Sequence, residues 1–443
     1  MRSPLWLPIL MVAATACDDY IQTGPDKTGN HPPPRMISGG GVGDGAIDGV
    51  VHVYVVDEAT RKPVANAAVR VGDVDGTTDE TGLFSVEDVK GPQAIAVKAE
   101  GYRSELWAGA NGANVTINVV AGTRPPVKHA DLSGAIGNIN GGITVPAGHE
   151  KVAVVTYSQS EKASAEENNI AQPNNQNVCT VVGNEECNFT VSSRIDKKNN
   201  IALIATIFDR NPANGSMTVA GWAYFEDLDV DDERPQTDII LQLIPASEQL
   251  TLNIDFGAVP SALTNAQAVI GVDIKNQGTL FFPAPVASAT PTIVAPRIDA
   301  FRDNNNNTIG KFYRLLGLAT DGQTGESVVL TRDIIGTTTL AAGGWLTPPT
   351  GISMSRADLK WTSVANATAT SIEITQGSTN VLNVSVLDGA TSVDIPDLLT
   401  LPSGQLTATV KGLGAPGLDV TNFALDQDYK KLTAISSQRV TIN

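Results

Sequence analysis

Short runs of alternating apolar and polar residues, separated by turn-forming residues, recur along the whole chain. This two-residue period is typical of β-strands with one buried face, and no stretch shows the sustained Leu/Ala/Glu/Lys periodicity of a long helix. The 41 glycines and 25 prolines suit many tight turns between short strands. In the first predicted domain, the pattern predicts strands at 51–55, 67–71, 83–86, 94–99 and 115–119. The pattern therefore predicts an all-β protein.

A chain of 443 residues is too long for one hydrophobic core. We expect tandem Greek-key β-sandwich domains, placed where breaks in the strand pattern coincide with Pro-containing joints at 125–126 and 348–349. Such joints act as semi-rigid spacers, so limited bending between domains is expected. The predicted sandwich domains cover residues 47–122, 128–246, 247–346 and 350–443.

The N-terminus has the pattern of an export signal. Arg2 precedes an apolar run of ten residues, Leu5 to Ala14, which is too short to cross a bilayer as a permanent helix. The run ends in Ala14-Thr15-Ala16-Cys17, which resembles a bacterial lipobox. The resemblance implies a signal peptide over residues 1–16 and a lipidated Cys17. The alternative is an ordinary cleavage site followed by a chance cysteine.

Residues 17–46 are rich in Pro, Gly and polar residues and predict a flexible tether after the lipidated cysteine. We therefore expect an exported protein whose membrane partner is reached through a lipid anchor on the cell envelope. An outer-membrane or cell-surface location is favoured. The outer leaflet of the inner membrane stays open, because Asp18 and Asp19 follow the cysteine, as in inner-membrane lipoproteins of enteric bacteria.

The first predicted sandwich carries three motifs. They are V-D-x-x-T-x-x-P-V-x-x-A-x-V-x-V at 56–71, T-D-E-T-G-x-F at 78–84 and V-x-A-E-G-Y at 97–102. Together they resemble the carboxypeptidase regulatory-like domain, a transthyretin-like Greek-key sandwich. The resemblance implies an accessory module, usually non-catalytic, that sometimes binds glycans or acts as a spacer. Tyr102 is expected to pack at a corner of the sandwich with its hydroxyl hydrogen-bonded.

The last predicted sandwich is loosely similar to fibronectin type III and Ig-like domains. Trp361 lies in an early strand pattern and Pro396 precedes a late loop. Both Trp361 and Trp222 lie in strand patterns and are expected in the core. Neither family predicts a particular function by its fold alone.

Two cysteines remain after Cys17, and they lie close together in the sequence. Cys179 and Cys187 flank Gly183-Asn184, a dipeptide suited to a hairpin turn. The two arms of such a hairpin lie close enough for a disulfide. Closing so short a loop stabilises the fold by roughly 2–3 kcal/mol. We therefore predict a disulfide between them.

The net charge and the absence of catalytic motifs argue against nucleic-acid binding and against the common classes of enzyme. A net charge of −17 opposes contact with a phosphate backbone, so nucleic acid is not expected as a partner. HExxH and GxSxG motifs are absent, the four histidines are dispersed, and no cysteine is left as a nucleophile. We expect no catalytic residues and no enzyme. A secreted hydrolase with a pocket of paired carboxylates remains an alternative.

The acidic segment 226–233, EDLDVDDE, is the one candidate for a metal site. Carboxylates crowded in this way repel one another, and a calcium ion with six to eight oxygen ligands would relieve the repulsion. The alternative is a solvated acidic loop, and no other cofactor is expected. The calcium candidates are Asp227, Asp229, Asp231 and Asp232.

One tryptophan is a candidate for ligand contact. Trp107 lies in a segment, 104–112, that reads as a loop of small polar residues, where an aromatic ring could serve as a platform for a glycan. The alternative is packing in the core or at a sheet edge. The leading hypothesis is a non-catalytic lipoprotein with a structural or adhesive role and envelope proteins as partners. The alternative is a lipoprotein that binds surface glycans or captures substrates.

Overall fold

The computed structural model describes residues 35–122, 128–158, 177–181, 186–194, 200–230, 233–283 and 285–442. The predicted signal peptide, Cys17 and the predicted joint at 125–126 lie outside the described residues. About 56% of the described residues are in strands and 5% are in helices, which confirms the prediction of an all-β sandwich protein. Among the described residues, none of the helices has the length and apolar character needed to cross a bilayer.

The described residues divide into unit 1 (35–122), unit 2 (128–243), unit 3 (246–346) and unit 4 (350–442), with the gaps given above. Unit 1 is a sandwich of two sheets around one core. Its alternating valines explain the packing, because Val51, Val53 and Val55 of one strand all point into the core and are fully buried. One sheet contains β1 (Gly41–Gly43), β2 (Asp48–Asp57), β5 (Leu83–Lys90) and β8 (Asn114–Val119). The facing sheet contains β3 (Ala68–Val71), β4 (Val74–Thr77), β6 (Gln93–Lys98) and β7 (Ser104–Ala110).

Two parts of unit 1 differ from the sequence prediction. Segment 104–112 is not a loop, because most of it forms β7, whose two faces pack into different cores and so show no alternation. Residues 39–43, expected to belong to the flexible tether, are buried, and β1 pairs with β8. Glycine-rich composition is common to linkers and to closely packed backbone, so composition alone could not separate the two.

Unit 2 is one curled sheet of seven strands around its own core. The sheet runs in the order β11-β10-β13-β14-β15-β9-β12, so β11 and β12 are its two edges. A short helix, α1 (Ile139–Gly142), follows the first strand. The strands are β9 (His129–Ile136), β10 (Glu150–Tyr157), β11 (Asn177–Val181), β12 (Asn188–Arg194), β13 (Asn200–Arg210), β14 (Met217–Asp229) and β15 (Gln236–Leu243).

Unit 3 shares its core with unit 2. Trp222 of β14 is fully buried in the unit 3 core, with its ring centroid 4.7 Å from that of Phe282. A three-stranded sheet contains β16 (Gln249–Asp255), β20 (Thr292–Pro296) and β23 (Thr339–Ala341). The facing strands are β17 (Asn265–Ile274), β18 (Gly278–Phe281), β19 (Val286–Ala287), β21 (Gly310–Thr320) and β22 (Glu326–Ile334). Short 3₁₀ turns are η2 (Ala246–Glu248) and η3 (Ile298–Ala300).

Unit 4 contains a core in which Trp361 is 5% exposed, and the expectation that Trp222 and Trp361 are core residues is confirmed. Its small sheet contains β24 (Ser353–Met354), β25 (Asp358–Lys360) and β28 (Ser392–Asp394). Its larger sheet contains β26 (Ala369–Gln376), β27 (Thr379–Val386), β29 (Leu406–Gly414) and β31 (Ala434–Ile442). The short elements are η4 (Asp397–Leu399), β30 (Phe423–Ala424), α3 (Leu425–Asp428) and η5 (Tyr429–Lys431).

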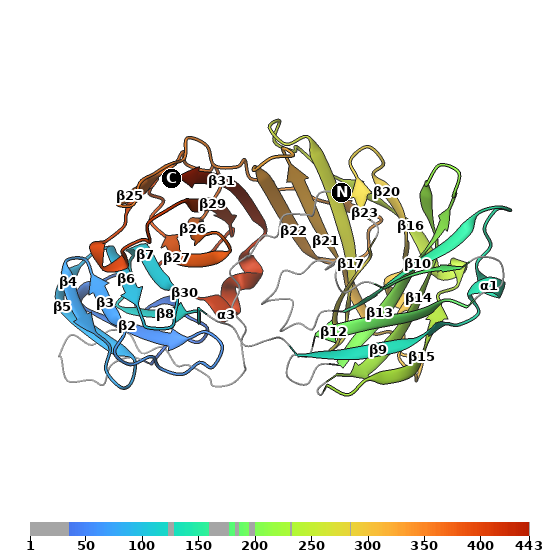
Figure 1. Cartoon of the computed structure of the whole chain (residues 1–443), viewed down its shortest axis with the longest axis horizontal. Helices are drawn as coiled ribbons and strands as arrows, with labels where there is room; N and C mark the ends of the chain where they lie inside the picture. The colour runs from blue at the N-terminus through green and yellow to red at the C-terminus, as the bar shows by residue number, and fades with distance from the viewer. Residues whose placement is uncertain are drawn as a thin grey trace.

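The order of the units in space differs from their order in the chain. A 13-stranded sheet passes from unit 3 into unit 4 through the pairing of β22 with β31. The same sheet passes from unit 4 into unit 1 through the parallel pairing of β27 with β7. The units therefore follow one another as 2, 3, 4 and 1, with the first and last units side by side at one end (Figure 1).

Candidate functional site

The acidic segment lies at the joint between units 2 and 3. Asp227 adopts a left-handed backbone conformation with φ 58°, and its N–H donates to Gln277 Oε1 at 2.8 Å. Its carboxylate accepts a hydrogen bond from the side-chain amide of Asn200. The backbone carbonyl of Asp229 accepts one from Gln236. The N–H of Asp227 therefore ties unit 2 to unit 3, and the bonds from Asn200 and Gln236 lie within unit 2.

Glu226 holds the same joint from the other side. Its Oε1 accepts the N–H of Asn304 at 2.8 Å, and its Oε2 lies 3.5 Å from the amide of Gln277. Burial raises the pKa of Glu226, and the charges of Asp227 and Asp303 raise this pKa further.

Calcium binding at this segment stays an untested hypothesis. Asp231 and Asp232 lie outside the described residues. Within the described part of the chain, no three His, Cys, Asp or Glu side chains form a group that could hold a metal ion. Of the described acids, Glu226 accepts hydrogen bonds from unit 3, whereas Asp227 and Asp229 accept theirs from within unit 2.

Trp107 is not a surface platform. Its side chain is 5% exposed, and its ring stacks on Phe423 with centroids 6.1 Å apart and an interplanar angle of 16°. The ring lies in the unit 1 core, while its neighbours Leu106 and Ala108 point into the unit 4 core. This corrects the expectation of an exposed glycan platform and supports the alternative of core packing.

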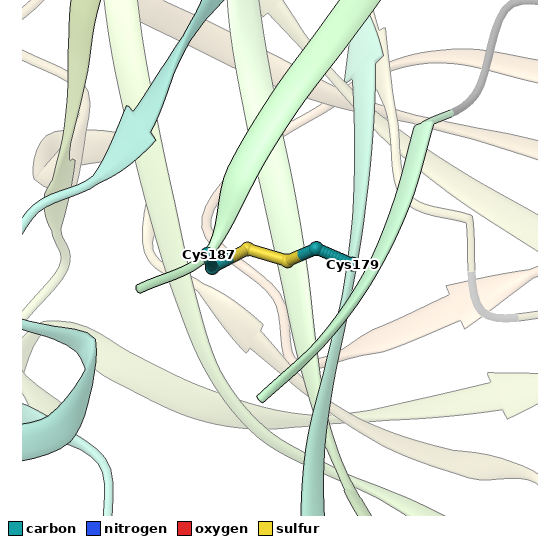
Figure 2. The surroundings of a disulfide bond; sticks show 2 residues. All are labelled: Cys179 and Cys187. Carbon is teal, nitrogen blue, oxygen red and sulfur yellow. A yellow bond between two sulfur atoms is a disulfide. The ribbon is translucent and has the colours of Figure 1, made fainter. Parts of the chain in front are cut away.

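The predicted disulfide is confirmed, but its two arms do not form the expected hairpin, because β11 pairs with β10 and β12 pairs with β9. Cys179 of β11 and Cys187, just before β12, are bonded, with Cα atoms 5.7 Å apart (Figure 2). Because β11 and β12 are the two edges of the unit 2 sheet, the bond closes the sheet on itself. Cys187 is fully buried in the core, and Cys179 packs against it.

Tyr102 confirms the expected corner packing. It is half-buried against the unit 1 core, and its hydroxyl is hydrogen-bonded to the carboxylate of Asp57. Burial raises the pKa of Tyr102, and the bond to Asp57 adds to this effect. The residue is therefore structural.

A row of buried polar side chains crosses the junction between units 1 and 4. Glu105 Oε1 accepts from the amide of Asn383 at 2.7 Å, and Asn383 Oδ1 accepts from Asn380 at 2.7 Å. Asn380 also donates to Glu373 at 3.1 Å, and Lys411 Nζ lies 3.2 Å from the second oxygen of Glu373. The row therefore links four neighbouring strands, β7, β27, β26 and β29.

Burial sets the protonation of this row. It raises the pKa of Glu105 to about 8, because the carboxyl group is 4% exposed and its bond from Asn383 only partly offsets the desolvation. Burial also lowers the pKa of Lys411, although the carboxylate of Glu373 opposes this change. A neutral Glu105 avoids an unpaired charge inside the junction.

An ion pair on the edge of the same junction completes the contact. The guanidinium of Arg70 in β3 binds Asp75 at 2.5 Å and also contacts Asp397 of unit 4. Sequence reasoning missed Glu105, Asn383 and Arg70 because the Glu105–Asn383 and Arg70–Asp397 contacts join distant parts of the chain. The local signal that was available is a charged residue, Glu105, beside the apolar run of β7.

No protein-family model matches the chain. No curated protein matches it either. Among solved structures, BcpA, the major pilin subunit of Bacillus cereus, matches at 10% identity over 66% of this chain and 97% of the pilin chain. A Ca²⁺-stabilized adhesin that helps an Antarctic bacterium bind ice matches at 9% identity over 90% of this chain and 98% of the adhesin chain. Both TM-scores are 0.15, too low for a shared overall arrangement.

Proposed function

We propose that this chain is a non-catalytic, lipid-anchored envelope protein that holds a rigid array of β-sandwich units at the membrane, with a structural or adhesive role. The observation that carries the proposal is the continuity of the array. Strand pairing joins units 3, 4 and 1, and a shared core joins units 2 and 3. Interfaces built from ladders and cores resist bending, which suits a scaffold better than an enzyme whose domains must move.

The spatial order of the units gives the array a direction. In the proposed function, lipidated Cys17 attaches the chain to the membrane on the N-terminal side of unit 1. Unit 2 then lies at the opposite end of the order 2, 3, 4, 1, in a sheet of its own. Its disulfide suits an exported protein, because disulfides persist in an oxidising environment.

Unit 1 is proposed as a spacer of the carboxypeptidase regulatory-like type. The support is its motif pattern, its packing around alternating valines and its burial of Trp107. This ring was the candidate for glycan contact in unit 1, and its burial takes away the observation that favoured glycan binding.

The test is intact-mass analysis and membrane fractionation of the native protein beside a Cys17→Ala variant. The proposal predicts a mature chain that starts at an acylated Cys17 and a variant that is lost from the membrane fraction. An unacylated native chain in the soluble fraction would overturn the anchor.

A further inference from the structure

The residues just before unit 1 form a strap, which we define as residues 35–43. Three side chains of β8, spaced two residues apart, each hold its backbone. The amide of Asn114 donates to Arg35 O at 3.0 Å, and the N–H of residue 37 donates to Thr116 Oγ1 at 2.9 Å. The amide of Asn118 donates to the carbonyl of residue 39. β8 therefore holds the backbone of the strap at three points, and Val42 of the strap packs into the unit 1 core.

The strap fits only because its central residues are glycines. A Cβ atom on Gly39 would lie 2.5 Å from the Cβ of Asp426, and one on Gly41 would lie 2.0 Å from the carbonyl oxygen of Phe423. Both glycines also have positive φ angles, 77° and 153°. The run Gly39-Gly40-Gly41 is therefore a docking sequence with no room for side chains.

The other edge of the strap binds the far end of the chain. β1 pairs antiparallel with β30, with Gly41 opposite Ala424 and Val42 opposite Phe423. The N–H of Leu425 donates to the carbonyl of Gly40 at 2.8 Å. The strap thus lies between β8 of unit 1 and the C-terminal segment 418–431, and it hydrogen-bonds to both.

The slot around the strap contains unsatisfied polar atoms. The Oδ1 atoms of Asn114, Asn118 and Asp426 are buried and have no hydrogen-bond partner within the described protein. Asp426 itself is 7% exposed and packs against Gly39. Water would reach these oxygens if the strap left the slot, so their desolvation opposes the docked state.

We propose that residues 35–43 are a detachable latch whose docking adds to the packing of Phe423 in holding the C-terminal segment 418–431 against unit 1. Release of the latch loosens that segment, so a pull or a binding event on the chain preceding Arg35 is transmitted to the C-terminal end of the array. The backbone ladder to β8 and the pairing with β30 favour docking, while the three buried oxygens oppose it. The latch is a property of the described fold and holds whether or not Cys17 is lipidated.

Hydrogen–deuterium exchange of the full chain tests the latch, with Gly41→Ala as the releasing variant. Gly45→Ala is the matched control, because Gly45 also has a positive φ, 75°, but has no atom within 4 Å of the new Cβ position. We expect exchange to become at least tenfold faster in both 35–43 and 418–431 in Gly41→Ala. In Gly45→Ala, segment 418–431 keeps its native rate.

Thr116→Val is a second releasing variant that preserves side-chain shape and removes only the hydroxyl that accepts the strap N–H. Thr116→Val tests the latch if Gly41→Ala unfolds the whole chain. Faster exchange in both segments, with native exchange in the unit 2 core at 201–208, supports the latch. Faster exchange in the strap alone, with 418–431 unchanged, overturns it.

Discussion

The indole of Trp107 stacks on the ring of Phe423, with centroids 6.1 Å apart, although the two residues come from the first and last units of the chain. The stack lies beside the pairing of β27 with β7 and the pairing of β1 with β30. Three independent contacts therefore join the two ends of the chain into one body. This closure places unit 1 at one end of the order 2, 3, 4, 1 and unit 2 at the other.

Replacement of Trp107 tests the first of these contacts. Trp107→Ala removes a ring that is 5% exposed, so we expect a loss of about 3–5 kcal/mol in the free energy of unfolding. Urea titration followed by circular dichroism measures the loss. The control is Ile335→Ala, since Ile335 is 70% exposed and its truncation should change stability by less than about 0.5 kcal/mol. Equal effects in the two variants would contradict the packing of Trp107.

The raised pKa of Glu105 predicts a pH dependence of stability. Between its ordinary pKa of 4.5 and its folded pKa of about 8, the folded state binds the proton and the unfolded state does not. Its contribution to stability is therefore full below pH 4.5, falls as pH rises through this window and is lost above pH 8. The limiting slope is about 1.4 kcal/mol per pH unit.

Glu105→Gln isolates that contribution, because a glutamine oxygen can still accept from Asn383 and carries no titrating proton. Urea midpoints at pH 5, 7 and 9 should fall less steeply for the variant than for the native protein, and the variant should be the more stable at pH 9. Parallel pH profiles for the two proteins would show that Glu105 is not protonated in the folded state at neutral pH.

Loss of the disulfide should affect unit 2 alone. A Cys179→Ala/Cys187→Ala variant reopens the edge between β11 and β12, and we expect a loss of roughly 2–3 kcal/mol from the loop entropy. Hydrogen exchange should become faster in 177–194 and stay native in unit 4. Faster exchange in unit 4 as well would mean that the disulfide supports the whole array.

Calcium should leave the stability unchanged. The carboxylate of Asp227 accepts from Asn200 and that of Glu226 accepts from Asn304, so both are already used within the fold. We expect the same melting temperature in excess Ca²⁺ and in excess chelator. A rise with Ca²⁺ that Asp227→Asn abolishes would instead establish a calcium site at the acidic segment.

The alternation of residues predicted the strands that have one buried face. Val51, Val53 and Val55 show the reason, since the pleat sends every second side chain into the core. β7 was not predicted as a strand, because Leu106 and Trp107 pack into different cores on opposite faces and the strand shows no alternation of apolar and polar residues. Without that alternation, the small residues around Trp107 favour a loop in the sequence pattern.

Long-range contacts were beyond the sequence pattern. The disulfide was predictable because Cys179 and Cys187 lie close in the chain, and the corner role of Tyr102 followed from a motif. The bond between Glu105 and Asn383 joins strands of units 1 and 4 that are distant in the chain and adjacent only in the fold. Local periodicity contains no information on which edge strands pair.

The most direct test of the folded-back array is a distance measurement by electron paramagnetic resonance. Nitroxide labels at Asp75→Cys and Asp397→Cys, in a Cys17→Ala background, report on two residues that contact the same guanidinium, that of Arg70. We predict a single narrow distribution in the short-distance range of the method. A broad distribution at long distances would mean that units 1 and 4 are separate, and it would contradict the order 2, 3, 4, 1 of the units.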